Sequence, residues 1–299
     1  MQKNLPNFVV VGAAKCGTTA LFEYLNQCPE IFIPKRKECR FFSEMPGDFV
    51  GGAAADFQND TIKTIEEYKE LFAVSNALYK GDISNDYLYY HDRAIANIKK
   101  YLGDGVKIVL ILRNPVDRAY SNYNHAVRLG SEPLSFMDAL EAESARIKNN
   151  YAWPFYYIDV GLYYKQVRAY LDNFCNIELC FYDKHKENIN MMFYEIYKFI
   201  VPDGVYNFNN VVSNQSYVYR KTNMSKLLMS RPVRYFSSKN FFHVANLNKM
   251  RKCLLESYKV KPEPLSYDIK KIIYNKYFYD DVENLEQYLG RSLEFLKCS

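Results

Sequence analysis

Residues 8–19 read FVVVGAAKCGTT, and they join a short apolar run to a loop of small residues. The apolar run, residues 8–11, predicts a fully buried parallel strand. Residues 20–25 then carry apolar side chains at helical spacing. A strand, a tight loop and a helix can form an anion site, because backbone N–H groups and the helix N-terminus both attract negative charge. A tight turn without a ligand is the alternative interpretation.

The loop differs from the one that binds nucleoside triphosphates. Lys15 supplies a positive charge, and Thr18 and Thr19 supply hydroxyl groups. The triphosphate loop requires the spacing Gly-x4-Gly-Lys-Ser/Thr. Here Thr18 stands where that lysine would be, and Lys15 comes two residues before Gly17. The spacing therefore favours an anion site of another kind.

A second buried strand is predicted at residues 107–112, which read KIVLIL. ATPases follow such a strand with an acidic residue that holds magnesium, whereas this strand is followed by Arg113. Asn114 then offers a helix N-cap, and Ser121 falls about two turns into the predicted helix. The end of this strand should attract an anion and repel a metal ion. Asp82 is the only obvious acidic substitute.

The remaining pattern alternates strands and helices, which predicts an α/β fold: a P-loop-like parallel sheet flanked by helices. We expect a single domain over residues 1–299, with residues 205–258 as an irregular cap or substrate segment. Further strands are predicted at 78–83 and 177–181, and further helices at 64–72, 92–102, 114–129, 135–148, 162–173, 187–200, 268–277 and 282–289.

Composition narrows the class of protein. The chain has 299 residues, with 39 Lys and Arg against 34 Asp and Glu, and 48% of its residues are hydrophobic. An excess of +5 suits an acidic ligand but does not demand nucleic acid, and no DNA- or RNA-binding motif is present. No run approaches the roughly 20 apolar residues of a membrane span, and no secretory signal is apparent. We expect a cytoplasmic protein, with peripheral membrane contact left open.

The cysteines and histidines show no metal-binding spacing. There are seven Cys and four His, without a CxxC pair. Free thiols in a reducing compartment are the preferred interpretation. A Cys175–Cys180 disulfide stays open, and no metal site is predicted.

These segments resemble the sulfotransferase superfamily that uses 3′-phosphoadenosine-5′-phosphosulfate (PAPS). Residues 12–25, GAAKCGTTALFEYL, resemble its 5′-phosphosulfate loop, and residues 107–130 resemble its 3′-phosphate motif. The pattern is nearer to the heparan-sulfate-type and bacterial carbohydrate sulfotransferases than to the cytosolic phenol and steroid enzymes. The likeness continues in KECRFF (37–42), GDISNDYLYY (81–90), GLYYKQ (161–166) and DDVENLEQYLGRSL (280–293).

The resemblance implies a set of cofactor contacts. A lysine would contact the 5′-phosphate and the bridging oxygen, the loop would cradle that phosphate, and an arginine and a serine would hold the 3′-phosphate. The cytosolic enzymes also have an Arg-Lys-Gly motif, matched here only by Arg-Lys-Thr at 220–222. The implied cofactor-binding residues are Lys15, Cys16, Gly17, Thr18, Thr19, Arg113, Ser121, Arg220 and Lys221.

The resemblance also implies catalytic residues. Glu38 matches the glutamate of the family's KExxFF segment and is the candidate general base. Lys15 would stabilise the leaving phosphate, and Lys37 is the preferred further cation. His125 is the rival base, because cytosolic members use a histidine, or it could line the pocket. A surface glutamate paired with its basic neighbours is the alternative for Glu38.

One segment departs from the family pattern. Residues 81–90 resemble a segment that reads Gly-Glu-x-Ser-Pro-x-Tyr, but Asp82 replaces the glutamate and Asn85 replaces the proline. A role for this strand end beside the substrate is still expected.

The implied activity is transfer of a sulfuryl group from PAPS, by in-line displacement, to a hydroxyl of a carbohydrate or glycolipid. An amine acceptor is the second choice. A sulfotransferase for a small alcohol, or a non-catalytic relative that binds anions or polysaccharides, remains an alternative.

Overall fold

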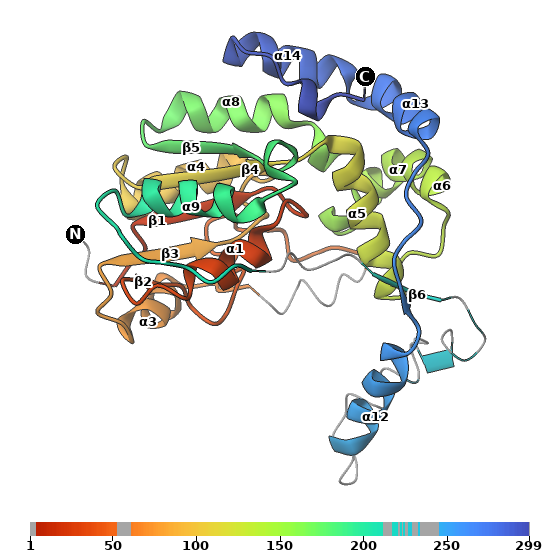
Figure 1. Cartoon of the computed structure of the whole chain (residues 1–299), viewed down its shortest axis with the longest axis horizontal. Helices are drawn as coiled ribbons and strands as arrows, with labels where there is room; N and C mark the ends of the chain where they lie inside the picture. Colours follow the sequence, from red (N-terminus) through yellow and green to blue (C-terminus); the bar gives the residue numbers. More distant parts are fainter. Residues whose placement is uncertain are drawn as a thin grey trace.

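A central parallel sheet organises the chain, as the computed structural model in Figure 1 shows. The structure describes residues 4–52, 61–211, 217–220, 222, 224, 227, 228, 233 and 245–298. The sheet has five strands in the order β2-β3-β1-β4-β5, and every neighbouring pair is parallel. Their bounds are β1 Phe8–Gly12, β2 Ile31–Phe32, β3 Tyr79–Ile83, β4 Lys107–Leu112 and β5 Ile177–Phe181. The predicted α/β fold is confirmed.

Helices cover both faces of this sheet (Figure 1). The pair α1 (Thr18–Leu25) and α9 (Ile189–Ile200) packs together on one face. The pair α4 (His91–Leu102) and α8 (Tyr163–Asn173) packs on the other, with α14 (Tyr279–Leu289) outside α8. Strands buried from both sides need apolar residues at every position, which explains the unbroken apolar runs at 8–11 and 107–112.

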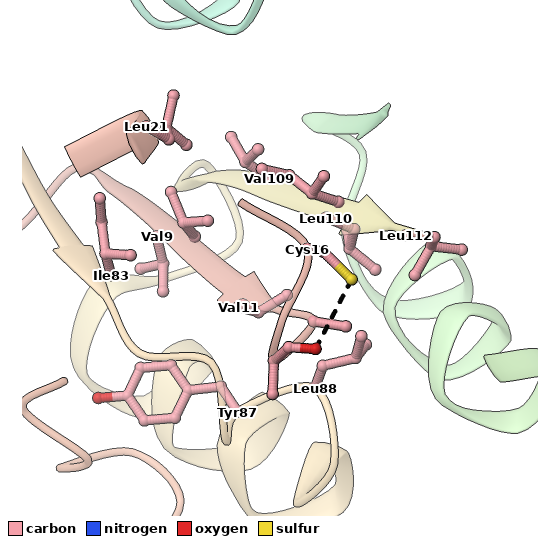
Figure 2. Packing of buried hydrophobic residues seen from close by; sticks show 14 of the residues in the cluster. Val9, Val11, Cys16, Leu21, Ile83, Tyr87, Leu88, Val109, Leu110 and Leu112 are labelled. Atoms are coloured by element: carbon pink, nitrogen blue, oxygen red, sulfur yellow. Dashed lines mark hydrogen bonds between the residues drawn. The ribbon is translucent and has the colours of Figure 1, made fainter. Parts of the chain in front are cut away.

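The core is densest around β1, which lies between β3 and β4 (Figure 2). Val9, Val11 and Leu110 are fully buried there, with Leu21 of α1 packed over the strands. Because strand order reverses on the two sides of β1, the carboxyl ends of β3, β1 and β4 meet at a topological switch point. Ligands of open α/β sheets bind at such a point.

The described residues form six further α-helices. They are α3 (Ile65–Ala73), α5 (Pro115–Arg128), α6 (Phe136–Glu141), α7 (Glu143–Lys148), α12 (Ala245–Glu256) and α13 (Tyr267–Tyr277). A capping box begins α3, because Thr64 Oγ1 accepts from Glu67 N–H and Glu67 accepts from Thr64 N–H. Asn114 caps α5 as expected.

One local expectation was wrong, and one strand was missed. The single helix expected over 135–148 is two helices, α6 and α7, which break at Ala142. Strand β2 was missed because two residues are too short for a period to be read. The described part of 205–258 includes β6 (Val218–Tyr219) and α12, and β6 pairs antiparallel with β7 (Lys259–Val260), which follows this range.

The structure also bears on the disulfide left open by the sequence and on membrane-spanning helices. All seven cysteines are free, so the Cys175–Cys180 disulfide that the sequence left open is not formed. Among the residues that the structure describes, no helix combines the length and the apolar character needed to cross a membrane.

Candidate functional site

The candidate site lies where the central strands end. The loop after β1 carries Lys15, and Arg113 directly follows β4. Glu38 joins this edge from another segment, because its backbone N–H donates to the carbonyl of Ile83, the last residue of β3 (3.0 Å). Tyr182 follows β5. Four segments that are distant in sequence thus meet at one edge.

The loop after β1 is shaped to receive an anion. Gly17 is the N-cap of α1 and has φ 91°, in the left-handed region that favours glycine. A Cβ atom at Gly17 would lie 3.2 Å from the Tyr182 ring, so a larger residue would crowd this cradle. Thr18 is buried and Thr19 is exposed at the start of the helix. Glycine therefore keeps the helix N-terminus open beside Lys15.

Lys15 lies among other cations. Burial and the nearby Arg128 lower the pKa of its ammonium group to about 8, and Lys37 and Arg113 lower it further, with Glu38 opposing them. Its backbone has φ 70°, which few residues without a glycine's freedom adopt. An anion bound beside this lysine would stabilise its charged form, which the neighbouring cations and burial destabilise.

Arg113 has a hydrogen-bond donor that no acceptor of the described chain satisfies. Its guanidinium lies over the Tyr182 ring, with 5.1 Å from Cζ to the ring centroid, and its Nη1 donates a long hydrogen bond to the Lys15 carbonyl (3.4 Å). Its buried Nε has no hydrogen-bond partner among the described residues. The Tyr163 hydroxyl donates to the Arg113 carbonyl (3.0 Å), which fixes the backbone at this strand end. A buried donor without a partner is costly, so this group fits a phosphate ligand.

Cys16 has a different character from its neighbours. Its side chain is fully buried, and Figure 2 shows its sulfur directed to the Ala14 carbonyl, 3.7 Å away. Burial raises the pKa of the thiol to about 12. Cys16 can therefore contribute its backbone N–H to an anion, while its thiol stays protonated and unreactive.

One face of α5 adds three side chains to the site. Ser121, His125 and Arg128 are spaced by four and three residues, which places them on the same face of the helix. Burial lowers the pKa of His125 to about 3, with Lys15 and Arg128 adding to the effect. The Arg128 guanidinium meets His125 Nδ1, so the imidazole accepts at Nδ1 and carries its proton at Nε2.

Glu38 is held at both carboxylate oxygens. Asn85 Nδ2 donates to Oε1 (2.8 Å), and Arg40 Nη2 donates to Oε2 (3.1 Å). Lys37 Nζ lies 3.7 Å from Oε1 and donates to Thr19 Oγ1 (2.7 Å). Lys37 thus connects the glutamate to the start of α1. The backbone of Glu38 has φ 63°, and strained backbone of this kind gathers at functional sites.

A buried carboxylate supports this segment from below. Asp82 is almost fully buried and accepts from the hydroxyl groups of Tyr68 and Tyr87 (2.8 Å each) and of Ser84 (2.7 Å). Burial raises the pKa of Asp82. With three donors from the chain itself, Asp82 is structural support, and it does not face a ligand as a magnesium-binding acid would.

The structure brings together most of the residues expected from the sequence. Arg220 is exposed, follows β6, and donates its backbone N–H to Tyr258 (2.8 Å). Lys221 lies outside the described residues. The group gathered at the strand ends consists of Lys15, Cys16, Gly17, Thr18, Thr19, Lys37, Glu38, Arg113 and His125, and Ser121 lies on the same face of α5 as His125.

Sequence reasoning missed two contributors, Tyr182 and Arg128. The Tyr182 ring packs against the Arg113 guanidinium and lies beside Gly17. Its position directly after β5, at the same edge as the other strand ends, could have indicated this place. Arg128 falls seven residues after Ser121, on the face already identified. The Arg128 guanidinium also lies 4.7 Å from the ring centroid of Tyr217, beside β6, and no spacing could have revealed that contact.

The donor set suits an anionic cofactor. Lowered lysine pKa, an unpartnered buried guanidinium nitrogen and a glycine cradle all favour phosphate groups. Within the described residues, no group of three or more His, Cys, Asp or Glu could hold a metal ion.

Comparison with known proteins points to one family. The family described as "Sulfotransferase domain" matches residues 5–276. A crystal structure of a sulfotransferase from Alicyclobacillus acidocaldarius superposes with a TM-score of 0.72, at 29% identity and with 97% of each chain covered.

Curated relatives include enzymes named for heparan sulfate. The mouse bifunctional heparan sulfate N-deacetylase/N-sulfotransferase 4 is 34% identical over 128 residues, which is 41% of this chain and 13% of that protein. The mouse heparan sulfate glucosamine 3-O-sulfotransferase 5 is 24% identical over 302 residues, covering 99% of this chain and 75% of that protein. The matched region is thus a small part of the first relative.

Proposed function

Because the chain belongs to the PAPS-dependent sulfotransferase superfamily, we propose that it transfers a sulfuryl group from PAPS to a hydroxyl group of a carbohydrate or glycolipid. The observation that carries the proposal is the arrangement at the sheet edge. Lys15, Lys37 and Arg113 gather around the glycine cradle, and the Glu38 carboxylate is tied to the same helix start through Lys37 and Thr19. Such a site can hold a polyanion and a proton acceptor together.

The cofactor residues divide between two strand ends. Lys15 and the backbone of 16–19 would hold the 5′-phosphosulfate end, because they combine a positive charge with a helix N-terminus. Arg113 and Ser121 would hold the 3′-phosphate, and Arg220 and Lys221 stay proposed contacts. When bound, PAPS supplies the sulfuryl group and a phosphate leaving group.

The chain's own groups would perform the acid–base work. Glu38 would accept the proton of the acceptor hydroxyl at a carboxylate oxygen. The Lys15 ammonium would stabilise negative charge that develops on the leaving oxygen. Lys37 would keep Thr19 and Glu38 in a fixed relation through its two contacts.

His125 fits a different task from proton removal. With a pKa of about 3 it stays neutral at physiological pH, and it is a much weaker base than the task needs. Its Nε2–H would serve as a neutral donor in the pocket. Glu38 stays the proposed general base, because the family's KExxFF segment is matched at this residue.

The acceptor class is supported by the relatives. Two of them are named for acting on heparan sulfate, a polysaccharide. We propose that residues 205–258 cover the acceptor side, because Tyr217 contacts Arg128 at the end of α5. A reducing, cytoplasmic location agrees with the seven free thiols.

A binding and transfer experiment tests the proposal. Labelled PAPS is offered with polysaccharides, glycolipids and small alcohols, and binding of the product 3′-phosphoadenosine-5′-phosphate (PAP) is measured by calorimetry. We expect PAP binding and transfer to a saccharide. We expect Glu38→Gln to lower transfer by about 100-fold or more while PAP binding is retained.

The outcomes separate the alternatives. Transfer only to small alcohols would replace the acceptor class. PAP binding without transfer to any acceptor would favour a non-catalytic anion-binding relative. Stabilisation by Mg·ATP but not by PAP would overturn the sulfotransferase proposal, and undiminished transfer by Glu38→Gln would remove Glu38 as the base.

A further inference from the structure

Glu38 is restrained at the oxygens that would take the proton. Asn85 Nδ2 donates to Oε1 at 2.8 Å and Arg40 Nη2 donates to Oε2 at 3.1 Å. Each carboxylate oxygen has two lone pairs, so one hydrogen bond to each still leaves a lone pair free on both. Two donors on different oxygens stop the carboxylate from rotating about its last bond. The group is therefore oriented and remains able to accept a proton.

Asn85 itself is well anchored. The preceding residue, Ser84, donates its backbone N–H to Val10 in β1 (3.1 Å) and its hydroxyl to Asp82 (2.7 Å). Ser84 Oγ also accepts the backbone N–H of Arg40 (3.3 Å). The Asn85 backbone therefore starts from the junction of β1 and β3, and its amide reaches Glu38 from the rigid sheet edge.

The residue type at this position departs from the family segment described in the sequence analysis. The similar family segment has proline where this chain has Asn85. Proline has no side-chain donor, so it could not make this bond to the glutamate. The substitution thus coincides with a new contact on the candidate base.

A neutral donor also has an electrostatic advantage here. Lys37 and Arg40 already place two positive charges near Glu38. A cationic donor in place of Asn85 would add a third positive charge beside the proposed proton acceptor. An amide orients the carboxylate without adding a charge.

We propose that Asn85 is a positioning residue, which holds Glu38 Oε1 so that the carboxylate faces the acceptor hydroxyl. The inference rests on the proposed function, because it gives Asn85 a role in the same proton transfer. It predicts that Asn85 affects turnover and leaves cofactor and acceptor binding unchanged.

The test compares kcat, the acceptor KM and the PAP Kd in four proteins: wild type, Asn85→Ala, Glu38→Gln and the double variant. We expect Asn85→Ala to lower kcat about tenfold, the usual scale for a hydrogen bond to a charged group. The KM and the PAP Kd should change by less than about twofold. In the Glu38→Gln background, Asn85→Ala should cause no further loss in single-turnover measurements.

Two more variants guard against a folding defect. Asn85→Asp keeps the size but replaces the donor with an oxygen that repels Glu38 Oε1, so the orienting bond is lost and its kcat should fall at least as far as that of Asn85→Ala. Asn173→Ala is the matched control, because that amide donates only to the Ala169 carbonyl within α8 (2.9 Å), and its kcat should be unchanged. Thermal melting of every variant accompanies the kinetics.

The results separate this inference from the proposed function. A wild type that transfers nothing overturns both. If the wild type is active, an unchanged kcat in Asn85→Ala overturns the positioning role, and so does an equal loss in both backgrounds. A raised KM or PAP Kd with unaltered kcat would make Asn85 a binding residue instead.

Discussion

The two halves of the site treat charge in opposite ways. Around the loop after β1, the positive charge of Arg113 helps to lower the pKa of Lys15. The buried Nε of Arg113 has no hydrogen-bond partner among the described residues. Around the end of β3, the carboxylates of Glu38 and Asp82 both accept hydrogen bonds from the chain. Glu38 receives a donor at each oxygen, and Asp82 receives three.

The loop after β1 has a buried donor that an anion could satisfy, whereas Glu38 and Asp82 already accept hydrogen bonds from the chain. A buried donor without an acceptor costs free energy until an anion arrives. A carboxylate with all its donors in place needs no ligand to hold its orientation. We therefore expect substitutions on the first half to affect binding of anions, and substitutions on the second half to affect turnover.

The largest effect is expected when Lys15, in the loop after β1, loses its charge. Lys15→Met keeps the length of the side chain but removes its charge, and we expect kcat/KM to fall about 1000-fold, because one preorganised charge at a leaving group is commonly worth that much. Labelled-sulfate transfer measures the loss. A fall of less than about tenfold would contradict the role of Lys15 in transfer.

An intermediate effect is expected at the other strand end. Arg113→Gln should weaken PAP binding by about 10- to 100-fold, since a hydrogen bond to a charged group contributes about 1.5–3 kcal/mol. Calorimetry gives the Kd. The control is Arg168→Gln, whose guanidinium pairs on the surface with Asp172 (3.3 Å), and it should leave PAP binding unchanged.

The smallest effect is a dependence on pH. Lysine loses its charge as pH rises, and the pKa of Lys15 is about 8. The fraction of charged Lys15 in the free protein therefore falls between pH 7 and 9, and the affinity for PAP should fall about tenfold over this range. Measured by calorimetry, the dependence should vanish in Lys15→Met. Affinity that rises with pH would contradict the assignment.

The strands of the carboxyl edge were predictable, but the contacts across it were not. Residues 8–11 and 107–112 are apolar at every position, and Asn114 with Pro115 marks a helix start in the sequence itself. By contrast, the break at Ala142 interrupts a continuous helical pattern without a proline or glycine to signal it. Periodicity reports local structure and does not report where a helix ends under tertiary packing.

The site followed the same division. The phosphate loop and Arg113 could be recognised from residue types at fixed spacing. The bond from Asn85 to Glu38 spans 47 positions, and the contact of Arg128 with Tyr217 spans a still longer stretch of chain. Such pairs are set by strand order and by the path of loops, so no single-sequence pattern contains them.

Asn114 has a consequence for how the protein can be handled. Its side-chain oxygen caps α5, and its Nδ2 donates to the carbonyls of Leu296 (2.9 Å) and Lys297 (3.3 Å). The last described turn of the chain is therefore fastened to the residue beside Arg113. A purification tag that pulls on residues 296–298, or a truncation that removes them, would loosen the contacts of the residue that caps α5. For binding assays, a tag is better placed at the other terminus.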